Sequence, residues 1–120
     1  MPDPAIPDPT TPDPTTTVGI ENVWLVEATY APDAAETRVP FRPEHLARID
    51  ELKRAGVYLE AGAFPDISSS LILLRAGSEA EALEIVGRDV YLRNGVWVEL
   101  RARPFGRVAR FTAEASGNAG

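Results

Sequence analysis

The sequence predicts an α+β fold with the element order strand, helix, strand, strand, helix, strand. Three observations lead to this prediction. Apolar residues alternate with a period of two in four segments. Two other segments have a helical period, and each is bounded by residues typical of helix ends. These segments lie between a proline-rich start and a Gly- and Ala-rich end, which leaves on the order of 90 residues for one compact domain.

The start of the chain is a repeat, because residues 2–6, 7–11 and 12–16 read PDPAI, PDPTT and PDPTT. Proline at this density fixes φ and removes backbone donors, and there is little here to bury. We therefore expect a disordered Pro/Asp/Thr-rich arm over residues 1–19, a folded domain over 20–111 and a flexible tail over 112–120.

The first half of the domain contains a strand and a helix. Residues 22–31 (NVWLVEATYA) alternate with apolar residues on both sides, which predicts a strand covered on both faces. After a break, residues 43–56 have a helical period, with Pro43 in the first turn and Gly56 just beyond the last. Leu46, Ile49 and Leu52 define the buried stripe of this helix.

The second half repeats the pattern with one more strand. VYLEAGAF (57–64) and SLILLRA (70–76) are predicted strands, the second apolar enough for a central position. Ser78 and Glu81 make a capping box for a short helix that ends near Gly87. GVWVELRARPF (95–105) is predicted as the last strand, stopped by Pro104.

This order of elements is that of the ferredoxin-like βαββαβ unit, in which two helices cover one face of a four-stranded antiparallel sheet. The other face would expose Trp24 or Leu25, Leu71 or Ile72, and Trp97 or Val98. That is too much contiguous apolar surface for a monomer of this size. We therefore expect a homodimer, or a multiple of dimers, in which two sheets face each other as a dimeric α/β barrel.

Composition excludes several classes of function. The chain has no cysteine and one histidine, so a thiolate nucleophile or a Cys-ligated zinc site is ruled out. The net charge of −6 without a basic run argues against a nucleic-acid partner. No apolar stretch is long enough to span a membrane, and no signal peptide is evident, so we expect a cytoplasmic protein. Neither a phosphate loop nor a flavin or nicotinamide motif occurs, and we expect no cofactor.

His45 is the first candidate for chemistry. At about 100° per residue its side chain lies within roughly 40° of the centre of the buried stripe, so it points inward. Its place in the first helical turn disfavours imidazolium, since the positive end of the dipole lies there. A half-buried neutral imidazole is a competent base, and a packed histidine satisfied by one hydrogen bond is an equally good interpretation.

Topology brings further groups toward His45. In a βαββαβ unit the start of the first helix, the end of the second strand and the connection into the last strand share one edge of the sheet. Those places hold His45, Asp66, and Asp89 with Tyr91. A carboxylate that orients an imidazole is the arrangement that acid/base chemistry needs. Solvated turn residues or caps are the simpler interpretation of both aspartates. Arg42, one turn from His45, is a candidate for binding a substrate carboxylate or enolate.

The chain also resembles the YCII-related family over about 85 residues, from Val23 to Phe105. The resemblance is carried by RPEHLARIDELKRAG (42–56), Leu59-x-x-Gly62-x-Phe64-x-Asp66, the SxxEA motif at 78–82, Asp89-x-Tyr91, Gly95 and Pro104-Phe105. The family's Gly-Pro-Phe reads here as Gly62-Ala63-Phe64, and its Asp-Pro-Tyr as Asp89-Val90-Tyr91.

The resemblance implies the dimeric α/β barrel fold and a catalytic His-Asp pair, which its motifs place at His45 and Asp66. It further implies substrate-binding roles for Asp89 with Tyr91 and for Ser69 or Ser70 at the start of the third strand. Relatives of the same fold include muconolactone isomerases, a dehydrochlorinase and cofactor-free monooxygenases, so the reaction type does not follow.

We therefore expect a small cofactor-independent acid/base enzyme of the isomerase, lyase or cyclase type. Its substrate would be a small cyclic or aromatic metabolite, and an Ala- and Arg-rich composition with one lysine is associated with natural-product pathways. The alternatives are a non-catalytic small-ligand-binding or accessory subunit and a cofactor-free monooxygenase. An enzyme should show His45 bonded to a carboxylate and open to a cavity, whereas a structural histidine would be enclosed.

Overall fold

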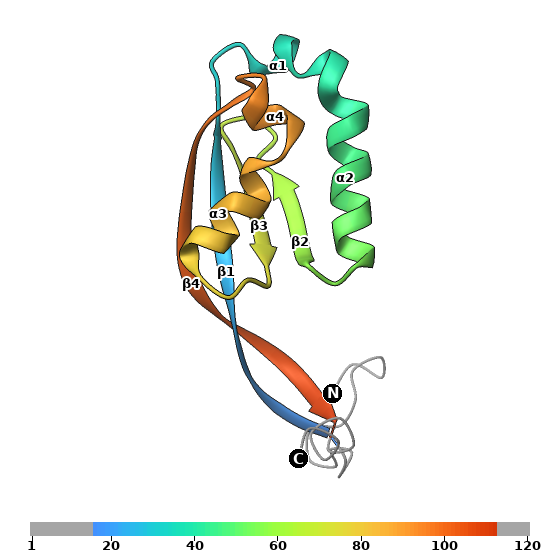
Figure 1. Ribbon diagram of the computed structural model, residues 1–120, viewed down its shortest axis with the longest axis vertical. Coiled ribbons are helices and arrows are strands. Elements are labelled where there is room, and N and C mark those ends of the chain that lie inside the picture. The colour runs from blue at the N-terminus through green and yellow to red at the C-terminus, as the bar shows by residue number, and fades with distance from the viewer. Residues whose placement is uncertain (1–15, 113–120) are drawn as a thin grey trace, which may run out of the picture. The chain divides into compact units, whose positions relative to one another are not determined.

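A computed structural model describes residues 16–112 of the chain and shows four strands and the helices between them (Figure 1). The elements in chain order are β1 (Thr16–Tyr30), α1 (Ala34–Thr37), the 3-10 helix η1 (Val39–Phe41), α2 (Arg42–Arg54), β2 (Tyr58–Ala63), β3 (Ser69–Leu74), α3 (Glu79–Gly87), α4 (Val90–Arg93) and β4 (Trp97–Thr112). The predicted ferredoxin-like order βαββαβ is confirmed, with α1, η1 and α4 added in the connections.

The four strands form one sheet in the order β2-β3-β1-β4. β3 pairs antiparallel with β1, where Val26 lies opposite Ile72, and with β2, where Ala61 also lies opposite Ile72. Figure 1 shows α3 in front of the sheet and α2 alongside β2. The side chains between helices and sheet form the core, in which Val26, Ala28, Ile72 and Leu74 are almost fully buried.

The first and last strands run further than the sequence predicts. β1 begins at Thr16, so residues 16–19 belong to a strand and the expected arm is corrected there. The β-branched Thr16, Thr17 and Val18 favour this conformation. Residues 1–15 and 113–120, which hold the rest of the predicted arm and tail, lie outside the described residues.

Pro104 does not stop the last strand, which continues to Thr112. The prediction was wrong because β4 lies at the edge of the sheet, next to β1 alone. A proline is tolerated in an edge strand, where its missing N–H can face away from the neighbouring strand.

The chain divides into two compact units, Asn22–Phe105 and a second unit made of the chain ends. In the described part of the second unit, Arg107 Nη1 donates to Glu21 Oε1 at 2.8 Å. In the larger unit lie both helices of the predicted fold and the whole of β2 and β3. Among residues 16–112, no helix combines the length and the apolar character that crossing a membrane requires.

The predicted helix ends are confirmed. Gly56 follows α2 with φ +77°, a left-handed conformation that glycine adopts without strain. Ser78 caps α3 by accepting a hydrogen bond from the Glu81 N–H at 3.1 Å.

The buried face of α2 differs in one residue from the predicted stripe. Ile49 and Leu52 pack against the core as expected, whereas Leu46 is exposed because it faces a cavity instead of the sheet.

The side chains of β4 do not alternate strictly between the two faces of the sheet. Trp97, Leu100 and Ala102 all contact the core, which strict alternation forbids. Trp97 therefore lies on the helix-covered side of the sheet, opposite to the face of Arg101 and Arg103.

Candidate functional site

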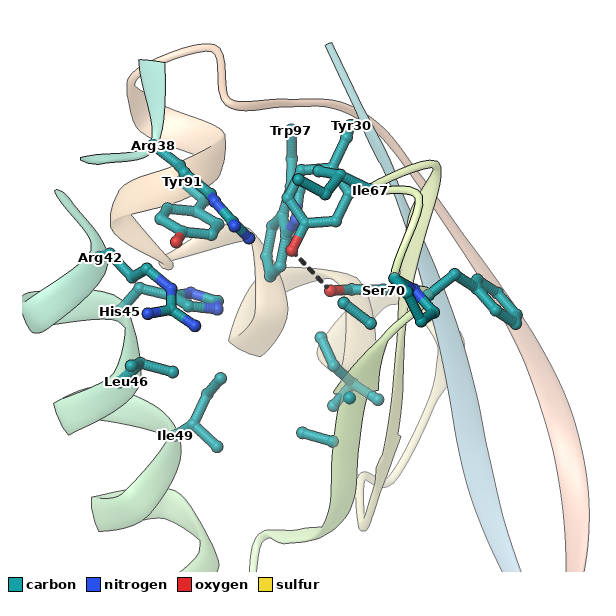
Figure 2. A pocket seen from close by; sticks show the side chains of 16 residues that line it. Tyr30, Arg38, Arg42, His45, Leu46, Ile49, Ile67, Ser70, Tyr91 and Trp97 are labelled. Carbon is teal, nitrogen blue, oxygen red and sulfur yellow. Dashed lines mark hydrogen bonds between the residues drawn. The ribbon is translucent and has the colours of Figure 1, made fainter. Parts of the chain in front are cut away.

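His45 lies in the first turn of α2 and is buried, with 5% of its surface exposed. The predicted inward orientation is confirmed. Pro43 and Glu44 precede it in a helix that begins directly after η1, so the backbone of this turn is fixed from both sides. The imidazole is thereby held at the end of the helix that lies nearest α4 (Figure 2).

The carboxylate partner of His45 is Asp89. Nδ1 of His45 lies 2.9 Å from both carboxylate oxygens of Asp89, which is fully buried. Asp89 also caps α4, since its Oδ1 accepts a hydrogen bond from the Tyr91 N–H at 2.8 Å. A buried carboxylate needs such donors, and these two hold it in place. The partner predicted for His45 is therefore corrected from Asp66 to Asp89.

Asp66 points into its own turn. It is exposed, and its Oδ1 accepts a hydrogen bond from the Ser68 N–H at 3.0 Å. Hydrogen bonds from Ser68 lower the pKa of Asp66. The β2–β3 turn does lie at the predicted edge of the sheet, because Phe64, Pro65 and Ile67 line the same cavity as His45. An Asx turn satisfies the carboxylate locally and turns it away from the imidazole. A part for Asp66 in the chemistry stays a prediction.

Two aromatic rings pack against the imidazole. The ring of Tyr91 stacks on it, with 3.7 Å between centroids and an angle of 7° between planes. Trp97 meets it edge-on at 5.3 Å and 88°. Burial raises the pKa of the Tyr91 hydroxyl, although the charges of Arg38 and Arg42 act in the opposite direction. The two contacts leave the imidazole no freedom to rotate within the core.

His45 borders a cavity of about 390 Å³ between α2, the sheet and the β2–β3 turn (Figure 2). Its walls are largely apolar, with Ile49, Ile72 and Phe64 among them. Its volume falls in the usual range of small-ligand pockets, as does the combination of apolar walls with a few polar groups. His45 therefore meets both parts of the expectation for an enzyme: a bonded carboxylate and an open cavity.

The start of β3 contributes one of the two predicted serines to the cavity. Ser70 lines it and its Oγ lies 3.1 Å from the hydroxyl of Tyr30. Ser69 is buried but is not a lining residue. Successive side chains of a strand point to opposite faces, so the structure brings Ser70 and not Ser69 to the site.

Arginines stand at the mouth of the cavity. Arg42, the first residue of α2, lines it as the sequence predicts, and Arg38 lines it as well (Figure 2). Arg38 and Trp97 were missed by the sequence analysis. Arg38 is one helical turn before Arg42, a spacing that could have indicated it. Trp97 gave no such signal, because its position depends on the irregular start of β4.

The β2–β3 turn holds Ile67 in a strained conformation. Its φ is +56°, in the left-handed region, which is unusual for a β-branched residue. The strain costs on the order of 1–2 kcal/mol, and packing of the side chain against the core offsets part of it. Ile67 also lines the cavity, so the strained turn forms part of its wall.

Within residues 16–112, no group of three or more His, Cys, Asp or Glu side chains is arranged to hold a metal ion. The polar groups that the described chain presents at the cavity are the imidazole of His45, the hydroxyls of Tyr30, Ser70 and Tyr91, and the two guanidinium groups. These groups can move a proton and bind an anion.

The sequence matches the family model of the YCII-related domain over residues 23–106. This chain belongs to the YCII-related family. The resemblance seen in the sequence is thereby confirmed.

The matches to two relatives span most of the length of each relative. The chain is 34% identical over 83 residues to "Derivative of benzaldehyde biosynthesis cluster protein C" of Emericella nidulans, which covers 60% of this chain and 85% of that protein. Protein YciI of Escherichia coli O6:H1 is 28% identical over 96 residues, which covers 72% of this chain and 98% of that protein.

A solved structure shows the same fold. It is 5-chloro-2-hydroxyhydroquinone dehydrochlorinase from Burkholderia phenoliruptrix AC1100, in complex with 2,5-dihydroxybenzoquinone. The TM-score is 0.60 at 18% sequence identity, and the match covers 69% of this chain and 92% of that one. The YCII-related chain thus shares the ferredoxin-like α+β fold of that structure, while its own dimerisation stays a prediction.

Proposed function

We propose that this YCII-related protein is a small cofactor-independent acid/base enzyme of the isomerase, lyase or cyclase type, acting on a small cyclic or aromatic metabolite. The observation that carries the proposal is the buried pair of His45 and Asp89 at the wall of an open cavity. The dehydrochlorinase of similar fold holds a hydroxylated quinone, and another relative is named for a biosynthesis cluster. Both names support a ring compound from a metabolic pathway.

The hydrogen bond to Asp89 sets the tautomer of His45. An ionised carboxylate only accepts hydrogen bonds, and Asp89 already accepts one from the Tyr91 N–H. Nδ1 of His45 therefore carries a proton and donates a hydrogen bond to Asp89. In the neutral ring the lone pair then lies on Nε2, which makes no hydrogen bond to any residue in the described range. Nε2 is the atom that would take a proton from the substrate, and Asp89 would stabilise the imidazolium that forms.

The stacked rings restrict the direction of proton transfer. Tyr91 covers one face of the imidazole, so a substrate cannot stack there. The lone pair of Nε2 lies in the plane of the ring, and a substrate C–H or O–H must approach along that plane. In this mechanism His45 removes a proton from a carbon next to a carbonyl, and the C–H electrons form the enolate and place the charge on the substrate oxygen. From a phenol it removes the O–H proton, and the electrons stay on that oxygen. The same imidazolium returns the proton at another atom or to a leaving group.

The proposal is tested by proton exchange. Wild-type protein should accelerate the transfer of solvent deuterium into ring C–H positions of cyclic 1,3-dicarbonyl compounds or hydroxyquinones, measured by proton NMR. H45Q and D89N should each lower the rate by on the order of 10²-fold, the usual scale of general acid/base assistance. Their effects should be non-additive, because Asp89 acts through the imidazole.

D66N is the matched control for D89N. It makes the same change of charge at an exposed carboxylate of the β2–β3 turn, and we expect a rate within about threefold of wild type. A loss as large as that of D89N would instead support the pair of His45 and Asp66. No acceleration by wild-type protein, with binding of the ring compounds intact, would favour a non-catalytic ligand-binding subunit.

A further inference from the structure

Two cations at the mouth of the cavity have no carboxylate partner among residues 16–112. Arg38 and Arg42 form no ion pair and no hydrogen bond with another described side chain. Glu44, the acid nearest to Arg42 in the sequence, is engaged by Arg93 at 3.3 Å. Glu36, the acid nearest to Arg38, is exposed and forms no ion pair with another described residue. A chain with a net charge of −6 thus leaves two positive groups unneutralised at one site.

Both cations act on the interior of the site. Arg38 and Arg42 lower the pKa of the Tyr91 hydroxyl, which burial raises. Tyr91 is the ring that stacks on His45, so the residue on which the two arginines act lies directly against the imidazole. Figure 2 shows the two side chains extending from successive turns toward the cavity, on the same side as His45.

The remainder of the cavity suits a flat, apolar body. Trp97 and Phe64 provide aromatic wall, and Ile49 and Ile72 provide aliphatic wall. A ring compound buried against these surfaces leaves its polar substituents at the mouth, where the guanidinium groups lie. Arginine is suited to this position because its planar fork matches the geometry of two anionic oxygens.

We propose that Arg38 and Arg42 form an anion clamp and that the ligand of this pocket is a small ring compound bearing an anionic oxygen group, either a carboxylate or an ionised enol or phenol. This inference builds on the proposed function, since it names the substrate class of the same site. The clamp would hold the charged group at the mouth of the cavity and the ring beside Nε2 of His45. Arg38 and Arg42 are therefore specificity residues, whereas the proton is moved by His45.

Binding is measured by calorimetry with matched acids and amides. The acids are benzoate, 2-hydroxybenzoate and the anion of 2,5-dihydroxybenzoquinone. The neutral controls are benzamide and 2-hydroxybenzamide, which keep the ring and the carbonyl but lose the charge. Wild-type protein should bind at least one of the two benzoates about tenfold or more tightly than its amide.

R38Q and R42Q should each reduce that preference by about threefold, and the double variant should abolish it. R54Q is the control, since Arg54 lies on the same helix but is exposed and paired with Asp50. It should bind the acids as wild type does. Arg42 is exposed and Arg38 is half-buried, and neither forms an ion pair with a described residue, so thermal melts of the three single variants should coincide.

Equal affinity for acids and amides would overturn the clamp, as would failure of every acid to bind or unchanged binding in the double variant. These results are independent of the exchange experiment. Acid binding that requires both arginines, together with no proton exchange, would sustain the clamp and refute the enzyme. Proton exchange that survives in the double variant, with unchanged substrate affinity, would support the enzyme and refute the clamp.

Discussion

The imidazole of His45 lies flat on the phenol ring of Tyr91, with their planes 7° apart and their centroids separated by 3.7 Å. Tyr91 also donates its backbone N–H to Asp89, whose carboxylate oxygens lie 2.9 Å from Nδ1 of His45. One residue of α4 thus fixes both the plane of the imidazole and the carboxylate that orients it. The geometry of the buried His45–Asp89 pair depends on this small helix as much as on α2.

Two substitutions of Tyr91 distinguish the contribution of its ring from that of its hydroxyl. Y91F keeps the stack and loses a hydroxyl that bonds to no other described side chain, so we expect the free energy of unfolding to change by less than about 1 kcal/mol. Y91L removes the stack and should lower it by about 1–3 kcal/mol. Because the imidazole is then less well positioned, proton exchange should also fall by at least about tenfold. Urea unfolding and the exchange assay check both, and similar effects in the two variants would contradict a positioning role for the ring.

The raised pKa of Tyr58 predicts a loss of folding stability in strong base. Burial raises its pKa from 10.0 to about 12, with Arg48 opposing and Asp89 reinforcing the shift. The folded state therefore binds this proton more tightly than the unfolded state. Its contribution is fully present below about pH 10 and is lost as the pH rises toward 12, a change of about 2–3 kcal/mol.

Y58F removes the titrating hydroxyl, so the comparison of wild type with Y58F isolates its contribution to stability. Urea unfolding of wild type and Y58F, measured at intervals from about pH 9 to 12, should give a steeper decline for wild type. Parallel curves would show that Tyr58 does not carry the raised pKa.

The sheet face opposite the helices predicts self-association. Leu25, Leu71, Leu73 and Phe105 line a shallow cavity on this face, and Leu71 and Phe105 are 36% and 43% exposed. We expect sedimentation velocity to give a dimer or a multiple of dimers at micromolar concentration, and L71E to shift it toward monomer. V39E is the control, because Val39 is an exposed apolar residue of η1. A wild-type monomer would refute the dimeric barrel for this chain.

The fold and the position of His45 could be predicted because they follow from local patterns. The helical period after Pro43, the glycine beyond α2 and the Ser78 cap each specify an element without reference to the rest of the chain. Topology then placed Asp89 and Tyr91 near His45. The existence of α4 could not be predicted, since a four-residue helix leaves almost no periodic signal.

The choice between the two aspartates was decided by hydrogen bonds that the sequence does not specify. Asp66 and Asp89 each accept from a backbone N–H two residues further on. In Asp66 that bond leaves the carboxylate in an exposed turn, whereas Asp89 is enclosed by the core and has His45 beside it. The same short-range motif therefore gives a surface turn in one place and a buried partner of His45 in the other. Burial separates them, and burial depends on the whole fold.

We propose that Asp89 holds the proton of His45 on Nδ1 and leaves the lone pair of Nε2 for the substrate. Nitrogen-15 NMR tests it directly, because His45 is the only histidine and its two ring nitrogens give unambiguous signals. For the neutral ring we predict a protonated Nδ1 and an unprotonated Nε2 in wild type and in D66N, with this preference weakened in D89N. A neutral ring protonated on Nε2 in wild type, or a preference unchanged by D89N, would contradict the claim.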